Sequence, residues 1–310
     1  MDLNNSNINL ILNKYINFTN KLCLDNNYDN NIRHLLYIII PAFIIRYGIN
    51  NEKTILDCFL HTKINISYTE NKQITAYFYR TIHKNDNNYF TKKSVVLNEY
   101  KTASMTGLLD NIIHEFNHAV NSVNNEIKVN DKKIMLRTGL CYFIYDINNI
   151  NNFEDKTKDL LLEEVINTKQ TADIINIINS FSAYEIENEE FNNILYSLKH
   201  EIGSDFYKSN AYALGSYITD ELINNKTFIP TIENLRFKGL VDDIPSWFDN
   251  VTGHDGSYFE LIKTLYEIEK LEQKYRKAKL FKNAKLNVIR DKIKSVMGII
   301  KDFDNKCIFK

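Results

Sequence analysis

Residues 114–118, His-Glu-Phe-Asn-His, form an H-E-x-x-H motif inside a segment with helical periodicity. Two histidines four positions apart lie on one face of a helix, where both imidazoles can reach a single metal ion. Glu115 follows the first histidine and lies beside that ion, placed to take a proton from a water molecule that the ion activates. The motif therefore predicts half of a zinc site, with His114 and His118 as ligands and Glu115 as general base.

Apolar residues recur at steps of three and four around the motif, which predicts an amphipathic helix. Ser104 or Thr102 is expected to cap its beginning. A chance motif, with two ordinary histidines on a partly buried helix, is the alternative. The apolar positions are Leu108, Leu109, Ile112, Ile113, Phe116, Ala119, Val120 and Val123.

A catalytic zinc ion needs a third protein ligand and one open position. Metzincins place a glycine and then a third histidine after the motif, but Asn121 and Asn124 occupy those positions here, which excludes that class. The remaining common arrangement takes a glutamate from a second helix. Residues 158–179 have an apolar helical period and contain Glu163 and Glu164. Periodicity alone does not separate these two neighbours, and a pair of exposed carboxylates remains the simplest alternative.

Residues 164–168, Glu-Val-Ile-Asn-Thr, resemble the N-E-x-x-S-D segment of thermolysin-like gluzincins, a group of zinc metallopeptidases that also includes the aminopeptidase N enzymes. The resemblance implies that Glu164 is the third zinc ligand, with Glu163 as its rival. Thr168 stands where that family has an aspartate that orients a ligand histidine, and a threonine has no carboxylate for this task.

Residues 210–215, Asn-Ala-Tyr-Ala-Leu-Gly, are similar to the Y-x-x-G segment of aminopeptidase N-like gluzincins. This similarity implies that Tyr212 donates a hydrogen bond to the oxyanion of the reaction. An ordinary core tyrosine is an equal alternative. Thermolysin-like enzymes use a histidine instead, so His200 and His254 are rivals, although His254 is expected to face solvent from a turn-rich loop.

The fold class expected is α+β and zincin-like: helix-rich, with a small, twisted, mostly antiparallel sheet before the H-E-x-x-H helix. Period-two stretches predict strands, and residues 126–145 predict one hairpin or two. The strands are expected at residues 64–68, 74–79 and 94–98. Three consecutive segments follow: an N-terminal helical segment (1–62), the sheet with the active-site helix and hairpin (63–150), and a helical subdomain with the third zinc ligand (151–310).

Two further residues are candidates for substrate binding. Residues 94–98 form the strand nearest to the motif in sequence, and as an edge strand it would pair with an extended peptide, with Asn98 at its end. An interior strand is the alternative. Arg137 could hold a substrate carbonyl or brace a carboxylate with its planar fork, whereas a surface arginine is the simpler expectation.

The composition limits which partners and which cellular compartment we expect. The 38 basic and 39 acidic residues give a net charge of −1, which disfavours nucleic acid and anionic membranes as partners. The apolar run 35–45 contains Pro41 and is shorter than the roughly 20 residues of a membrane span. The N-terminus lacks the pattern of a secretory signal, and the four cysteines are far apart, so we expect a cytoplasmic protein with free thiols.

These patterns together predict a zinc metallopeptidase that acts on a peptide or protein substrate. Nothing in the chain resembles the G-x-M-E-N segment with which aminopeptidases hold a free amine, which favours an endopeptidase. Two other functions stay open: a catalytically silent zincin-like module that binds metal for regulation or interaction, and a helical interaction protein with an accidental motif. Oligomeric state is not indicated.

Overall fold

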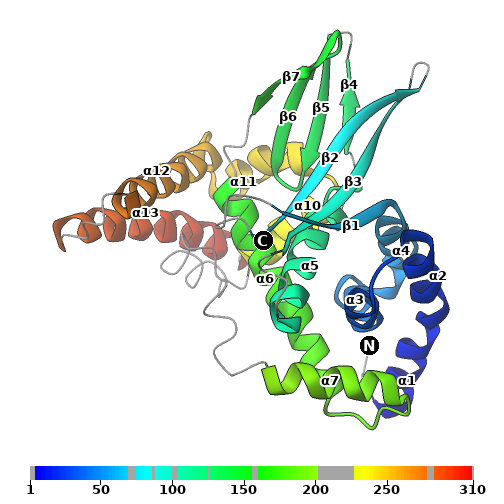
Figure 1. The fold of residues 1–310 in the computed structure, drawn as a ribbon. Helices are drawn as coiled ribbons and strands as arrows, with labels where there is room; N and C mark the ends of the chain where they lie inside the picture. The colour runs from blue at the N-terminus through cyan, green and yellow to red at the C-terminus, as the bar shows by residue number, and fades with distance from the viewer. Residues whose placement is uncertain are drawn as a thin grey trace. The chain divides into compact units, whose positions relative to one another are not determined.

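The chain is helix-rich and belongs to the α+β class, as the sequence predicts, with two small sheets in its described part (Figure 1). The computed structural model describes residues 4–68, 75–85, 88–99, 104–124, 126–130, 132–155, 160–201, 227–277 and 283–308. Contacts divide the chain into two compact units, Met1–Val120 with Gln170–Ser209, and Asn121–Lys169 with Asn210–Lys310. The units are discontinuous in sequence, because one long helix, α6, contributes to both.

The first unit is built around α3, Asn30–Tyr47, in which every residue from Leu35 to Ile44 is buried. Asp29 caps this helix by accepting a hydrogen bond from the Ile32 N–H at 2.8 Å. The expected buried segment is therefore confirmed as a core helix. The other helices of this unit are α1 (Asn5–Lys14), α2 (Ile16–Asn26), η1 (Ile49–Asn51), α4 (Glu52–His61), α5 (Met105–Val120) and α7 (Glu189–Glu201), with the later part of α6 (Leu160–Phe181).

A three-stranded sheet precedes α5 in the first unit, in the order β1-β3-β2. Its strands are β1 (Thr62–Ser67), β2 (Ala76–Asn85) and β3 (Asn88–Asn98). The strands β2 and β3 form a long antiparallel hairpin, and β1 runs parallel to β3 (Figure 1). All three expected strands are present, and β2 and β3 are much longer than the sequence indicates.

The interpretation of residues 94–98 as an edge strand is wrong. They belong to β3, which is the central strand and pairs with β1 from Lys63 to Ser67 and with β2 on its other side. Val95 and Leu97, two residues apart, are fully buried, so the sheet face that they share is covered. Closeness to the motif in sequence says nothing about lateral order within a sheet, and this is why the expectation failed.

The second unit contains a four-stranded antiparallel sheet, in the order β4-β5-β6-β7. It confirms the hairpins expected near residues 126–145 and extends them by one strand. The strands are β4 (Ile127–Val129), β5 (Lys133–Thr138), β6 (Cys141–Asp146) and β7 (Asn149–Asp155). The helices are the first part of α6, then α10 (Phe228–Phe237), η3 (Val241–Asp243), α11 (Ile244–Thr252), α12 (Ser257–Lys277) and α13 (Asn283–Ile308).

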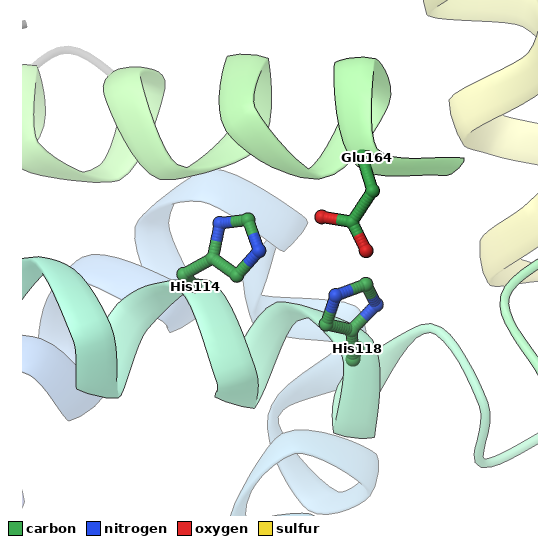
Figure 2. A group of neighbouring side chains, drawn as sticks. All are labelled: His114, His118 and Glu164. Carbon is green, nitrogen blue, oxygen red and sulfur yellow. The ribbon is translucent and has the colours of Figure 1, made fainter. Parts of the chain in front are cut away.

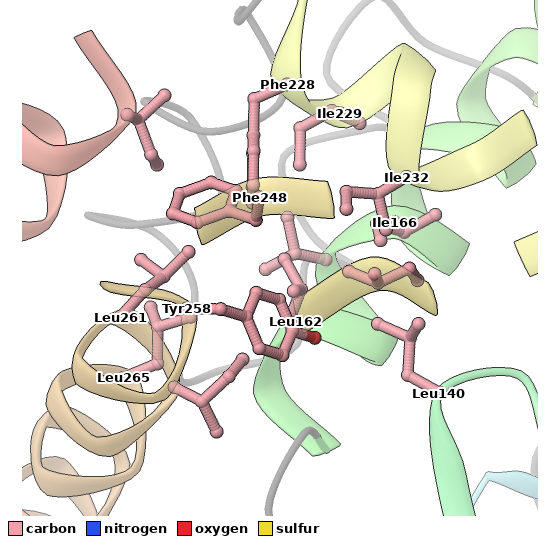
Figure 3. Packing of buried hydrophobic residues seen from close by; sticks show 14 of the residues in the cluster. Leu140, Leu162, Ile166, Phe228, Ile229, Ile232, Phe248, Tyr258, Leu261 and Leu265 are labelled. Atoms are coloured by element: carbon pink, nitrogen blue, oxygen red, sulfur yellow. The ribbon is translucent and has the colours of Figure 1, made fainter. Parts of the chain in front are cut away.

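Aromatic rings form the centre of the second unit's apolar core (Figure 3). Phe248 stacks on Phe303 at 4.8 Å between ring centroids and meets Phe228 edge-on at 5.6 Å. Leu162 and Ile166 of α6 belong to the same cluster. The first turns of α6 are therefore held in place by burial of their apolar side.

Two other expectations can be compared with the structure. Cys23, Cys58 and Cys141 are buried and Cys307 is half-buried, and all four are free thiols. Among the described residues, no single helix combines the length and apolarity needed to cross a bilayer. Only the bent pair Asn30–Tyr47 and Ile49–His61, at 112° to each other, has both when its members are taken together.

Replacing Phe248 by Ala should lower the free energy of unfolding by about 3–5 kcal/mol, because it removes a buried ring and leaves a cavity. Phe248→Leu keeps much of the volume and should cost clearly less. Urea unfolding followed by tryptophan fluorescence measures both, since Trp247 packs on Phe303 at 5.1 Å. Equal midpoints for Phe248→Ala and the unchanged chain would contradict this account of the core.

Candidate metal centre

The helix α5 carries the motif and is anchored by its apolar stripe. Its beginning is capped by Ser104, whose Oγ accepts a hydrogen bond from the Gly107 N–H at 3.1 Å. Thr102, the other candidate cap, lies outside the described residues. Phe116, inside the motif, stacks on Phe59 of α4 with ring centroids 4.2 Å apart. This packing fixes the rotation of α5 and so the direction of its histidines.

His114 and His118 lie one turn apart, as their spacing predicts. Their ring centroids are 5.2 Å apart, with planes at 78° to each other. His118 is 7% exposed, His114 is half-buried, and Glu115 is 6% exposed. Two imidazoles and a carboxylate on one helix are thus largely removed from water.

Glu164 of α6 is the acidic residue that meets the two histidines (Figure 2). One ligand atom from each of Glu164, His114 and His118 lies within 4.8 Å of the others, and Glu164 is 8% exposed. Glu163 instead accepts hydrogen bonds from Arg236 and from the Leu140 N–H. The two neighbouring carboxylates, between which helical periodicity does not choose, therefore lie with different partners.

Asn117 joins the motif helix to α6. Its Oδ1 accepts a hydrogen bond from the Tyr47 hydroxyl at 3.0 Å, and its Nδ2 donates to Thr171 Oγ1 at 3.1 Å. Asn117 is fully buried, and Thr171 lies on α6 two helical turns after Glu164. The variable position of the motif before His118 is therefore a clamp between helices. The sequence offers one signal for it, a polar residue next to an apolar stripe.

Arg137 is not a surface residue, so that expectation is wrong. It lies on β5 with 1% of its surface exposed, and its guanidinium donates hydrogen bonds to the backbone carbonyls of Gly139 and Asn124. The planar fork of an arginine suits two carbonyls at once. Its described contacts brace the turn after β5. Asn98, the other candidate for substrate binding, is 2% exposed at the end of the central strand β3.

Of the candidate oxyanion donors, the structure describes only the side chain of His254. Tyr212 and Gly215 lie outside the described residues, and so does the side chain of His200. His254 is exposed in the turn after α11, which confirms the expectation that it faces solvent. The part of the site that the structure describes therefore consists of the motif residues and Glu164.

A further carboxyl group, Glu269 of α12, is influenced by Glu164. Burial raises the pKa of Glu269, and the negative charge of Glu164 raises it further, while Lys270 opposes the effect. Nothing in the sequence around Glu269 separates it from the other acids of an amphipathic charged helix. Its effect on the site is electrostatic, because any cation bound at Glu164 would reduce the repulsion between the two acids.

Comparison with protein-family models, with curated proteins and with solved structures gave no match to this chain.

Replacing Asn117 by Ala should lower the free energy of unfolding by about 1–3 kcal/mol, because the Thr171 hydroxyl loses a buried partner. Tyr47→Phe removes only the hydrogen bond on the other side of the amide, and it should cost less. Urea unfolding of the two variants beside the unchanged chain measures the difference. If Asn117→Ala is as stable as Tyr47→Phe, the hydrogen bond between Asn117 and Thr171 contributes nothing.

The raised pKa of Glu269 predicts an effect of pH on stability. The native state holds this proton more tightly than the unfolded chain, so stability falls as pH rises from the usual value of 4.5 through the native pKa. Glu269→Gln should therefore raise the melting temperature of the metal-free protein at pH 7 and change it little at pH 4.

Glu267, on the same helix, is the matched control for Glu269. Its hydrogen bond and ion pair with Lys292 lower its pKa, so its stabilising contribution is present above the usual pKa and is lost at acidic pH. Glu267→Gln should lower the melting temperature at pH 7. The same sign of change in both variants would contradict the electrostatic account.

Proposed function

We propose that this chain is a zinc-dependent metallopeptidase of the gluzincin type that cleaves within peptide or protein substrates. The observation that carries the proposal is the meeting of Glu164 with both histidines of the H-E-x-x-H motif. A chance motif gives no reason for an acidic side chain from a second helix to lie beside both imidazoles. The choice of zinc and of the reaction comes from the chemistry of these groups.

The donor set suits zinc. Two histidines and one glutamate are the protein ligands of one class of catalytic zinc sites, which leaves a position open for water or substrate. Ligand atoms around a tetrahedral zinc ion lie about 3.4 Å apart, given bonds of about 2.0–2.1 Å. The three side chains, whose ligand atoms lie within 4.8 Å of one another, would need only small rotations to close on one ion.

A zinc ion held there would act as a Lewis acid and lower the pKa of a bound water far below its bulk value, to about 7. Glu115 would accept the proton of the attacking water and then return it to the amine of the departing peptide. Glu115 is 6% exposed and directly follows the first ligand histidine, which supports this role. Tyr212 remains the predicted donor to the oxyanion.

The arrangement of the first unit also supports the proposal. A three-stranded sheet precedes α5 in the chain and contacts it through β2 and β3, as expected for a zincin-like fold. Because β3 is central, an extended substrate that pairs with this sheet would have to use β1 or β2 at an edge. A silent metal-binding module remains the alternative function, and the buried Glu115 favours an enzyme over it, since a structural zinc site needs no base.

Glu115→Gln should retain about one zinc ion per chain but cleave peptides about 10²–10⁴-fold more slowly, because only the base is removed. His118→Ala should lose the metal as well. Zinc content is measured by atomic absorption after dialysis, and cleavage with a library of fluorogenic peptides. Glu260→Gln, at an exposed position of α12, is the control and should behave as the unchanged chain.

The two measurements separate the possible functions. Full activity in Glu115→Gln would rule out the mechanism. Bound zinc without cleavage of any peptide would favour the silent module, and a chain that binds no zinc would leave only the accidental motif.

A further inference from the structure

Glu163, the neighbour of Glu164, lies at the centre of a buried polar cluster in the second unit. Its Oε1 accepts a hydrogen bond from Nη2 of Arg236, and its Oε2 accepts one from the Leu140 N–H at 2.8 Å. The side chains of Glu163 and Arg236 are 1% and 0% exposed. A carboxylate and a guanidinium are thus fully withdrawn from water to hold one residue of α6.

The turn between β5 and β6 is shaped around this carboxylate. Gly139 has a φ of +55°, and a Cβ on it would lie 2.0–2.2 Å from the carboxylate atoms of Glu163. Only glycine permits both the positive φ and so close an approach. Ser122 Oγ accepts a hydrogen bond from the Gly139 N–H at 3.2 Å and holds the turn from its other side. The turn between β5 and β6 therefore packs closely against α6 at the carboxylate of Glu163.

Arg236 contacts two successive turns of α6. The same Nη2 that donates to Glu163 lies 3.3 Å from Oδ1 of Asn167, four residues further on. Glu163 is in the first turn of α6, which begins at Leu160, and Glu164 directly follows it. The first turn of a helix lacks part of the backbone ladder. A side-chain contact that spans two turns fixes the rotation of this end about the helix axis.

We infer that Glu163 and Arg236 are positioning residues for the proposed metal ligand. Adjacent residues on a helix point about 100° apart, so fixing the direction of Glu163 also fixes that of Glu164. A buried ion pair is a weak source of stability, because desolvation offsets much of the attraction, and apolar replacements are often neutral. The ion pair orients Glu163 whatever its net contribution to the free energy of unfolding. This role rests on the proposed metal site, and it goes beyond the ligand set by naming what orients it.

The inference is tested by Zn²⁺ affinity of the full chain, measured by competition with a chromophoric chelator. The double variant E163Q/R236M keeps an oxygen for the Leu140 N–H but loses the charged pair. Its dissociation constant for Zn²⁺ should rise about 10–100-fold, the usual effect of removing a group that orients a metal ligand. With Co²⁺ in place of Zn²⁺, its visible absorption should also weaken, because the carboxylate no longer holds one direction.

The matched control is a second ion pair between the same two helices. Lys169 of α6 and Glu233 of α10 lie 3.7 Å apart, with side chains 17% and 9% exposed. K169M/E233Q removes this pair further along α6, and its Zn²⁺ affinity should stay within about twofold of the unchanged chain. Melting temperatures of the metal-free proteins show whether the two double variants lose similar stability.

Arg236→Lys provides a second test if the double variant does not fold. It keeps the positive charge but has no planar fork to reach both Glu163 and Asn167, so the dissociation constant for Zn²⁺ should still rise severalfold. Affinity equal to that of K169M/E233Q, in either variant, would overturn the positioning role while leaving the metal site intact. An unchanged chain without Zn²⁺ affinity would overturn the proposed function and this role together.

Discussion

Two adjacent carboxylates, Glu163 and Glu164, are both nearly withdrawn from water, and this is the constraint on which the rest of the structure depends. A buried carboxylate is unfavourable unless cations or hydrogen-bond donors compensate its charge. Glu163 is compensated within the protein by Arg236 and the Leu140 N–H. Glu164 lies with two imidazoles, and one ligand atom from each of the three side chains lies within 4.8 Å of the others. The metal proposal rests on that grouping of donors, which Glu163 does not share.

Polar contacts hold α6 along most of its length. Its first turns are held by Arg236, and Thr171 is held by Asn117 of the motif helix. Two residues further on, Asp173 pairs with Arg46 of α3 at 2.9 Å. Burial of apolar side chains determines which side of a helix faces inward, but hydrogen bonds, which are directional, set the rotation of the helix more finely. A ligand on such a helix is already oriented before any metal binds, which is what a precise metal site requires.

The sequence predicted those parts of the fold and of the candidate site that depend on local periodicity. The motif helix, the buried segment around Pro41 and the pairing of His114 with His118 follow from spacing alone. The choice of Glu164 needed a motif resemblance, because helical period does not separate neighbours. The central position of β3 and the burial of Arg137 could not be predicted, since both depend on contacts between distant segments. The role of Arg236 could not be predicted for the same reason, because its partner Glu163 lies far away in the sequence.

Buried asparagines show how a biased composition can still be constrained by structure. Asparagine is common throughout this chain, yet some of the buried ones, such as Asn9 and Asn117, make specific long-range bonds. The Asn9 amide bonds to the backbone of Glu185 and Glu187, and Nδ2 of the half-buried Asn124 donates to the Phe237 carbonyl. An amide has two donors and an acceptor oxygen, so its burial is tolerated only where partners already exist. Composition therefore supplies asparagine at many positions, but the fold decides which ones join distant segments, and Asn117 within the motif is one of these.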